Sequence, residues 1–174
     1  MSRNELLTLP NIISVLRLLL APLFVVAGRA ETRVVLVILA AVSDMLDGWL
    51  ARRKRVASRT GAIIDPVADR VFVLTALVVL LVEGVLSVGQ TLVLLLRDVM
   101  TTIGFIVARS VSWLRPVEFR ARIAGKVVTA FQVVTLLAAL LRPALVPPLV
   151  LVTGIAAAYS VVDYTLALWR ARVT

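Results

Sequence analysis

The sequence predicts an all-α integral membrane bundle of six transmembrane helices, with both chain termini in the cytoplasm. Hydrophobic residues make up 61% of the 174 residues, charged residues make up 17%, and the mean hydropathy is +1.03. Soluble domains are about 45–50% apolar and about 25% charged, so both departures indicate lipid as the solvent. Because a span needs about 20 apolar residues, a chain of this length holds at most six or seven spans. We therefore expect residues 1–174 to form a single membrane domain.

Apolar runs separated by polar breaks place the spans in order along the chain. The expected spans are 11–28, 34–50, 61–82, 91–109, 124–141 and 147–168. Tight breaks occur where glycine or proline favours a turn, at Gly28-Arg29, Glu83-Gly84 and Arg142-Pro143. The first apolar run is expected to remain as a span, because the residues before it do not have the pattern of a signal peptide.

Lysine and arginine define the expected orientation, since cytoplasmic loops carry an excess of both. One side of the bundle would receive the two termini and the basic loops 51–60 and 110–123, whereas the other would receive only Arg29, Arg33 and Arg142. This places the termini and both loops in the cytoplasm of a multi-pass plasma-membrane protein. The net charge of +9 is then explained by topology and by attraction to anionic membrane lipid. Nucleic acid is not expected as a partner, because no basic surface is interleaved with aromatic residues.

The absence of two residue types restricts the chemistry. The chain has no cysteine and no histidine, which excludes disulfides, thiolate metal sites, cysteine nucleophiles and histidine bases. Any reaction must therefore use carboxylates, lysine, arginine or hydroxyl groups.

Carboxylates gather where lipid disfavours them. Four of the ten acidic residues lie within the 26 residues from Asp44 to Asp69, at the expected cytoplasmic ends of spans two and three. A charge at depth costs roughly 2.5–3.5 kcal/mol, so the four need compensation. Helical spacing puts one group on a single face of span two and another on a single face of span three: Asp44, Asp47, Gly48, Ala51 and Arg52, then Gly61, Asp65 and Asp69. Antiparallel helices joined by residues 53–60 would direct all four carboxylates at one another.

Four convergent carboxylates without histidine suit hard cations, and two magnesium or manganese ions about 3.5–4 Å apart are a familiar arrangement. Gly48, Ala51 and Gly61 would leave room for a ligand, and Arg52 offers a fork for phosphate oxygens. The pattern predicts a metal-assisted phosphate site. Small residues also suit tight helix packing, but that interpretation does not explain acids on the same faces.

The spacing of these residues matches a known signature. The stretch Asp44-Met-Leu-Asp47-Gly48-Trp-Leu-Ala51-Arg52, followed after eight residues by Gly61-Ala-Ile-Ile-Asp65-Pro-Val-Ala-Asp69, resembles the D-x2-D-G-x2-A-R-x8-G-x3-D-x3-D motif of the CDP-alcohol phosphatidyltransferases. Every fixed position of the motif is present at its spacing. The resemblance covers nearly the whole chain, and Leu9-Pro10-Asn11 with Arg17 looks like the family's entry into its first span.

The resemblance implies a role in phospholipid biosynthesis. In the reaction that the resemblance implies, the hydroxyl of an acceptor alcohol attacks the β-phosphorus of CDP-diacylglycerol and CMP is released. The resemblance implies that Asp44, Asp47, Asp65 and Asp69 bind two divalent cations, magnesium or manganese, with Asp69 also the catalytic base. It implies that the CDP-lipid is bound by Asp44, Gly48, Ala51, Arg52 and Gly61, and that the protein is a homodimer.

The acceptor is less closely defined. Arg97-Asp98 interrupts span four and Lys126 opens span five, and each charge is unfavourable in lipid unless it faces the bundle. The segment Arg97-Asp98-Val-Met resembles the cardiolipin synthases of the family, whose acceptor is phosphatidylglycerol. Members that use glycerol 3-phosphate commonly have Arg-Glu here and are the alternative. We expect Arg97, Lys126 and Arg122 to bind the acceptor, and Arg97 and Asp98 to form an ion pair.

A cation transporter is the alternative from another functional class, since transporters also use carboxylates within the membrane. It predicts charges near mid-membrane on broken helices and often internal repeats. The four aspartates instead lie beside a basic loop, and no repeat is visible. We therefore expect an enzyme.

Overall fold

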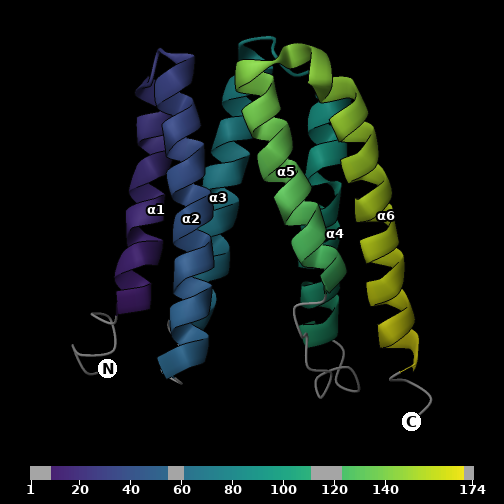
Figure 1. The fold of residues 1–174 in the computed structure, drawn as a ribbon. Helices are drawn as coiled ribbons and strands as arrows, with labels where there is room; N and C mark the ends of the chain where they lie inside the picture. The colour runs from purple at the N-terminus through teal and green to yellow at the C-terminus, as the bar shows by residue number, and fades with distance from the viewer. Residues whose placement is uncertain (1–8, 55–60, 111–122, 171–174) are drawn as a thin grey trace. The chain divides into compact units, whose positions relative to one another are not determined.

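The regular structure is entirely helical in the part of the chain that the computed structural model describes, residues 9–54, 61–110 and 123–170. Its six α-helices and one short 3₁₀ turn are α1 (Leu9–Val26), α2 (Ala30–Lys54), α3 (Gly61–Val82), α4 (Val88–Ser110), α5 (Ile123–Leu141), η3 (Pro143–Leu145) and α6 (Val146–Arg170) (Figure 1). Each predicted span coincides with one α-helix, with ends that differ by a few residues. The all-α prediction is confirmed for these residues.

The helices form two compact units. The first contains α1, α2 and α3, and the second contains α4, most of α5 and α6 (Figure 1). In the first unit α1 packs against both α2 and α3, and in the second α4 packs against α6. The expected single domain of residues 1–174 therefore stays a prediction.

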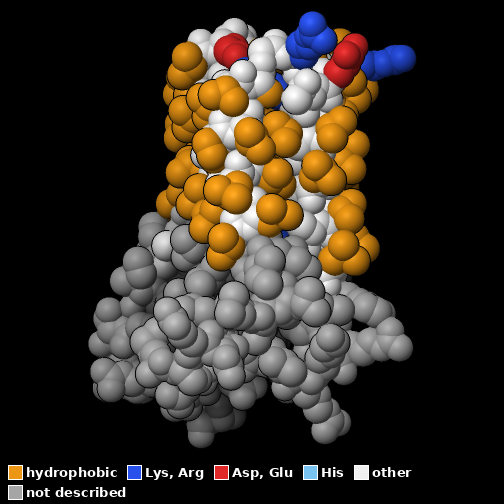
Figure 2. Space-filling view, turned by 90° about the vertical axis from the view of Figure 1, so that its left-hand side faces the viewer, with side chains coloured by type: hydrophobic (Ala, Val, Ile, Leu, Met, Phe, Trp, Pro, Cys, Tyr) orange, Lys and Arg blue, Asp and Glu red, His pale blue; other side chains and the backbone are white. Residues whose placement is uncertain are grey.

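The helix surfaces are unusually apolar. Large hydrophobic side chains such as Leu16, Leu19 and Leu23 of α1 are about half exposed. Figure 2 shows hydrophobic side chains over the coloured part of one face, with charged residues gathered at its upper end. Within the described residues, Pro143–Asp163 is long and apolar enough to cross a membrane, and the shorter apolar helical stretches are Val15–Val26, Arg70–Val82 and Val127–Leu141. An integral membrane protein fits these surfaces, whereas the count of six spans and the cytoplasmic termini stay predictions.

Aromatic and aliphatic side chains fill the first unit. The rings of Phe24 in α1 and Phe72 in α3 meet edge to face, with centroids 5.9 Å apart and planes at 81°, a favoured geometry for aromatic pairs. The other buried apolar residues described in these three helices are Leu20, Ala21, Leu36, Val37, Ala40, Val73, Ala76, Leu77 and Leu80. The core therefore holds α1 between its two neighbours.

The predicted break at Glu83-Gly84 is a specific helix end. Gly84 has φ +72°, which glycine adopts without steric cost. The N–H of Val85 donates to the Leu80 carbonyl at 2.9 Å, which is the long hydrogen bond of a Schellman motif. Ser87 caps the start of α4, because its hydroxyl accepts from the Gln90 N–H at 3.2 Å while the Gln90 side chain accepts from the Ser87 N–H at 2.9 Å.

Polar side chains are buried inside the second unit. The hydroxyls of Thr135 in α5 and Thr153 in α6 lie 3.4 Å apart, and each also donates to the carbonyl four residues earlier in its own helix. Close packing occurs nearby, since a Cβ placed on Gly154 of α6 would lie 2.8 Å from Val93 Cγ1 of α4. The glycine lets α4 and α6 approach closely.

Candidate active site

Helix α2 carries the first half of the signature. It runs without interruption to Lys54, so Asp44, Asp47, Gly48, Ala51 and Arg52 lie on one continuous helix. The predicted helical spacing is thereby confirmed. The side chain of Asp44 is described, whereas those from Asp47 onward in this helix lie outside the described part of the structure.

Helix α3 carries the second half. It begins at Gly61, which places Asp65 and Asp69 in its first turns, although their side chains and that of Gly61 lie outside the described part. Helices α2 and α3 belong to the same unit and touch each other. The convergence of the four carboxylates therefore stays a prediction.

Asp44 is held by an arginine from the first helix. Nη1 of Arg17 lies 3.3 Å from Asp44 Oδ1, with the Arg17 side chain fully buried and the Asp44 side chain 49% exposed. Nε of Arg17 donates to Ser43 Oγ at 3.2 Å, and Ser43 Oγ donates to the Ala40 carbonyl at 2.8 Å. One buried guanidinium therefore contacts Asp44, the first residue of the signature, and Ser43, the residue before it.

No role for Arg17 was predicted from the sequence. Arg17 was named only as part of the segment that resembles the family's entry into its first span. A signal was present, since Arg17 is the one charge inside the apolar run Val15–Val26. An ionisable residue within a membrane segment usually serves a site and has a partner. The partner could not be read from the sequence, because the register of α1 against α2 depends on tertiary packing.

The donor set fits hard divalent cations. Within the described residues no group of three metal-ligating side chains is found, since Asp44 is the one signature aspartate whose side chain is described. Its carboxylate is half exposed and holds Arg17 through Oδ1, which leaves Oδ2 for another ligand. Carboxylate oxygens are the donors that magnesium and manganese prefer.

The predicted acceptor residues belong to the second unit. Arg97 lies in α4 and Lys126 in α5, with side chains outside the described part, and Arg122 lies wholly outside the described residues. The expected ion pair between Arg97 and Asp98 therefore stays a prediction. A contact that sequence reasoning missed is that Gln132 of α5 donates to Asp98 Oδ2 at 2.8 Å.

Gln132 also joins the two helices through the backbone. Its buried side-chain amide donates to the Leu94 carbonyl of α4 at 2.6 Å. Because both Gln132 contacts lie on one turn of α4, the Asp98 carboxylate is fixed relative to α5. Asp98, an acid in a largely apolar unit, therefore has a hydrogen-bonded partner, as buried polar groups require.

The chain matches the profile of CDP-alcohol phosphatidyltransferases over residues 7–169, which includes both helices of the signature. It belongs to the CDP-alcohol phosphatidyltransferase family. This membership confirms the resemblance carried by the aspartate motif.

Two names occur among the curated relatives of this chain. A protein of Streptomyces coelicolor named cardiolipin synthase (CMP-forming) is 42% identical over 106 residues, covering 56% of this chain and 49% of the relative. Proteins named CDP-diacylglycerol--glycerol-3-phosphate 3-phosphatidyltransferase are 32% identical in Sodalis glossinidius, covering 88% of this chain and 86% of the relative, and 32% in Pectobacterium atrosepticum, covering 78% of each. The chain thus spans about half the length of the cardiolipin synthase relative that it matches.

The end of the first unit that lies opposite the Arg17–Asp44 contact has its own ion pair. Arg33 of α2 donates to both Glu83 oxygens, at 2.5 and 2.7 Å, and its guanidinium carbon lies 5.2 Å from the Phe24 ring centroid. The hydrogen bonds from Arg33 hold the pKa of Glu83 below its ordinary value, and the bonds to Glu83 raise the pKa of Arg33. A bidentate pair of this kind joins the start of α2 to the end of α3.

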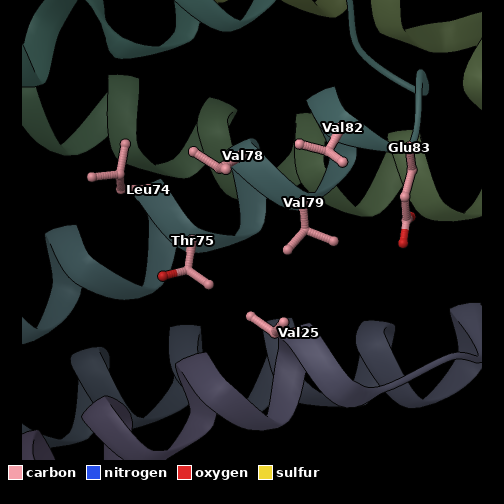
Figure 3. Close-up of a pocket in the computed structure, with 7 residues that line it drawn as sticks. All are labelled: Val25, Leu74, Thr75, Val78, Val79, Val82 and Glu83. Atoms are coloured by element: carbon pink, nitrogen blue, oxygen red, sulfur yellow. The ribbon is translucent and has the colours of Figure 1, made fainter.

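An apolar groove of about 550 Å³ lies near that end, between α1 and α3 (Figure 3). Its lining is Val25, Leu74, Thr75, Val78, Val79, Val82 and Glu83. The Thr75 hydroxyl donates to the Val71 carbonyl and Glu83 is paired with Arg33, so both polar groups of the lining have partners. The groove lies away from the Arg17–Asp44 contact, so it is not the candidate active site.

Proposed function

We propose that this chain transfers a phosphatidyl group from CDP-diacylglycerol to the hydroxyl of a glycerol-type acceptor and releases CMP. The observation that carries the proposal is the complete aspartate signature on α2 and α3 of a family member, with Asp44 held by the buried Arg17. The names of the relatives support the same reaction class.

The proposed reaction is a substitution at phosphorus. The acceptor oxygen forms a bond to the β-phosphorus of CDP-diacylglycerol, the pyrophosphate P–O bond to CMP breaks, and Asp69 takes the acceptor proton. Asp44, Asp47, Asp65 and Asp69 would hold two magnesium or manganese ions, which when bound neutralise charge on the phosphates. Arg52 would bind phosphate oxygens, while Gly48, Ala51 and Gly61 would leave space for the CDP moiety.

We propose phosphatidylglycerol as the acceptor, which would make the product cardiolipin. The segment Arg97-Asp98-Val-Met and the identity to the Streptomyces relative support this choice. Glycerol 3-phosphate is the second candidate, because the Sodalis relative matches along most of this chain. In either case Arg97, Lys126 and Arg122 would bind the acceptor phosphate.

The proposed setting is the plasma membrane, with six spans, cytoplasmic termini and a site that opens to the cytoplasm. The concentration of lysine and arginine in the termini and in loops 51–60 and 110–123 supports this orientation. A homodimer is proposed by analogy with the family. A cation transporter is disfavoured by the family membership.

The acceptor is tested by supplying purified protein and CDP-diacylglycerol with phosphatidylglycerol or glycerol 3-phosphate, and identifying the lipid product by mass spectrometry. Cardiolipin formed from phosphatidylglycerol supports the first candidate. Efficient use of glycerol 3-phosphate, with no cardiolipin from phosphatidylglycerol, would make glycerol 3-phosphate the acceptor.

Lys126→Ala tests the binding of the acceptor phosphate. It should raise the KM for the acceptor far more than the KM for CDP-diacylglycerol, since Lys126 lies on α5, outside the signature helices. A rise confined to the KM for CDP-diacylglycerol would assign Lys126 to the other substrate.

A further inference from the structure

The Arg17 side chain carries a charge in a buried position of an apolar helix, which is energetically unfavourable without partners. It lies in α1 and is fully buried. Its contacts with Asp44 and Ser43 compensate part of this cost. These two contacts lie on a single turn of α2, at the first residue of the signature and the residue before it.

The geometry constrains the orientation of Asp44. An arginine presents its N–H groups in a rigid planar fork, and here Nε is bonded to Ser43 while Nη1 is bonded to Asp44 Oδ1. Ser43 is in turn tied to the backbone of α2 through the Ala40 carbonyl. The Asp44 carboxylate is thus anchored at one oxygen, with Oδ2 left for a ligand and the side chain half exposed.

We propose that Arg17 is a positioning residue that holds Asp44 in the orientation in which it binds a divalent cation. The inference rests on the proposed function, because it takes Asp44 as a metal ligand. Groups that hydrogen-bond to metal ligands orient them, and their loss typically weakens metal affinity or activity by about 10–100-fold.

Two roles for Arg17, orienting Asp44 or acting only through its charge, predict opposite changes in metal affinity when Arg17 is removed. If Arg17 acted only through its positive charge, it would repel a nearby cation, and its removal would strengthen metal binding. If it acts by orienting Asp44, its removal weakens metal binding even though a repulsive charge is lost. Metal affinity therefore separates the two explanations.

The experiment measures Mn²⁺ binding to the purified full chain in detergent, by electron paramagnetic resonance of free Mn²⁺. Arg17→Gln should raise the Kd by about 10–100-fold relative to wild type. Arg17→Lys keeps the charge but lacks the planar fork, so it should also weaken binding. Arg29→Gln is the matched control, because it removes the same charge from an exposed position in the same unit, and its Kd should equal that of wild type.

Ser43→Ala tests the same role of Arg17 with little change in side-chain volume. It removes the acceptor of the Arg17 Nε bond and should weaken Mn²⁺ binding in the same direction as Arg17→Gln. If Arg17→Gln does not fold, Arg17→Lys and Ser43→Ala decide the result, and wild-type affinity in both overturns the proposal. Equal or tighter binding by a folded Arg17→Gln protein also overturns it.

Mn²⁺ binding by the wild type distinguishes a failure of the proposed metal-dependent function from a failure of the proposed role of Arg17. A wild-type protein that binds no Mn²⁺ and releases CMP without metal would contradict the metal-dependent function, and with it this inference. A wild-type protein that binds Mn²⁺, with Arg17 variants that bind it equally well, would contradict the role of Arg17 alone.

Discussion

At the scale of single residues, buried polar side chains join neighbouring helices of this protein. Arg17 reaches Asp44, Arg33 reaches Glu83, and Gln132 bonds to the α4 backbone and to Asp98. Buried polar groups are destabilising when unpaired, so such contacts specify which helix faces meet. In the first unit one contact lies beside the signature and the other lies at the opposite end.

Asp69→Asn should reduce turnover by at least about a hundredfold, the lower limit of what a general base contributes. The change removes the proposed base and one metal-binding carboxylate while keeping the side-chain volume. CMP release measures the loss, and an unchanged melting temperature serves as the control for folding. A variant that turns over at the wild-type rate would contradict the role of Asp69.

Glu83→Gln should make the stability less dependent on pH. Because the pKa of Glu83 is lowered in the folded protein from its ordinary value of 4.5, its stabilisation is present above that pH and is lost as pH falls through the folded pKa. The effect should be below about 1 kcal/mol, since the side chain is 42% exposed and solvent screens the pair.

Melting temperatures of wild type and Glu83→Gln, measured across the acid range, check this prediction. The wild type should be the more stable of the two at neutral pH, and the two should converge at low pH. Glu31→Gln, an exposed acid near the start of α2, is the control and should behave as wild type. A difference that persists unchanged at low pH would show that Glu83 acts by packing rather than by charge.

At the scale of helices, apolar runs and glycine or proline breaks were sufficient to predict where each helix lies in the sequence. All six helices lie where the sequence places them, and the Schellman end at Gly84 follows the predicted break at Glu83-Gly84. These features are local, so they can be read from spacing and residue type.

Contacts between helices were not predictable in the same way. The bonds from Arg17 to Asp44 and from Gln132 to Asp98 join residues 27 and 34 positions apart. Such contacts depend on the register of packed helices, which single-sequence periodicity does not determine. The signature residues were found in the sequence because they recur at helical spacing within α2 and α3, whereas Arg17 stands alone in an apolar run.

Gly154→Ala should separate α4 from α6. The added Cβ would lie 2.8 Å from Val93 Cγ1, and a valine side chain is stiff, so a backbone shift is needed. Overpacking of this kind typically costs about 1–3 kcal/mol. The melting temperature should fall, and Val93→Ala in the same chain should restore part of it.

Gly89→Ala is the matched control, because Gly89 lies in α4 and an added Cβ there meets nothing within 4 Å. Its melting temperature should be unchanged or slightly raised, since alanine favours a helix over glycine. An equal loss of stability in both variants would contradict the close packing of α4 on α6.

At the scale of the whole molecule, the proposed topology can be tested on α2 alone. This helix has 25 residues, about 37 Å at 1.5 Å per residue, which exceeds the roughly 30 Å hydrocarbon thickness of a bilayer. The chain has no cysteine, so single cysteines at Glu31 and Lys54 should react with impermeant reagents from opposite sides of the membrane. Labelling of both from one side would contradict the proposed span.

The aspartate signature is proposed to support metal-dependent phosphatidyl transfer. The most direct measurement is the release of CMP from CDP-diacylglycerol by the purified chain, with and without a glycerol-type acceptor, magnesium and EDTA. We expect release that requires the acceptor, stops when EDTA is added and returns with excess magnesium or manganese. Full CMP release in the presence of EDTA, or no release under any condition by folded protein, would contradict metal-dependent phosphatidyl transfer.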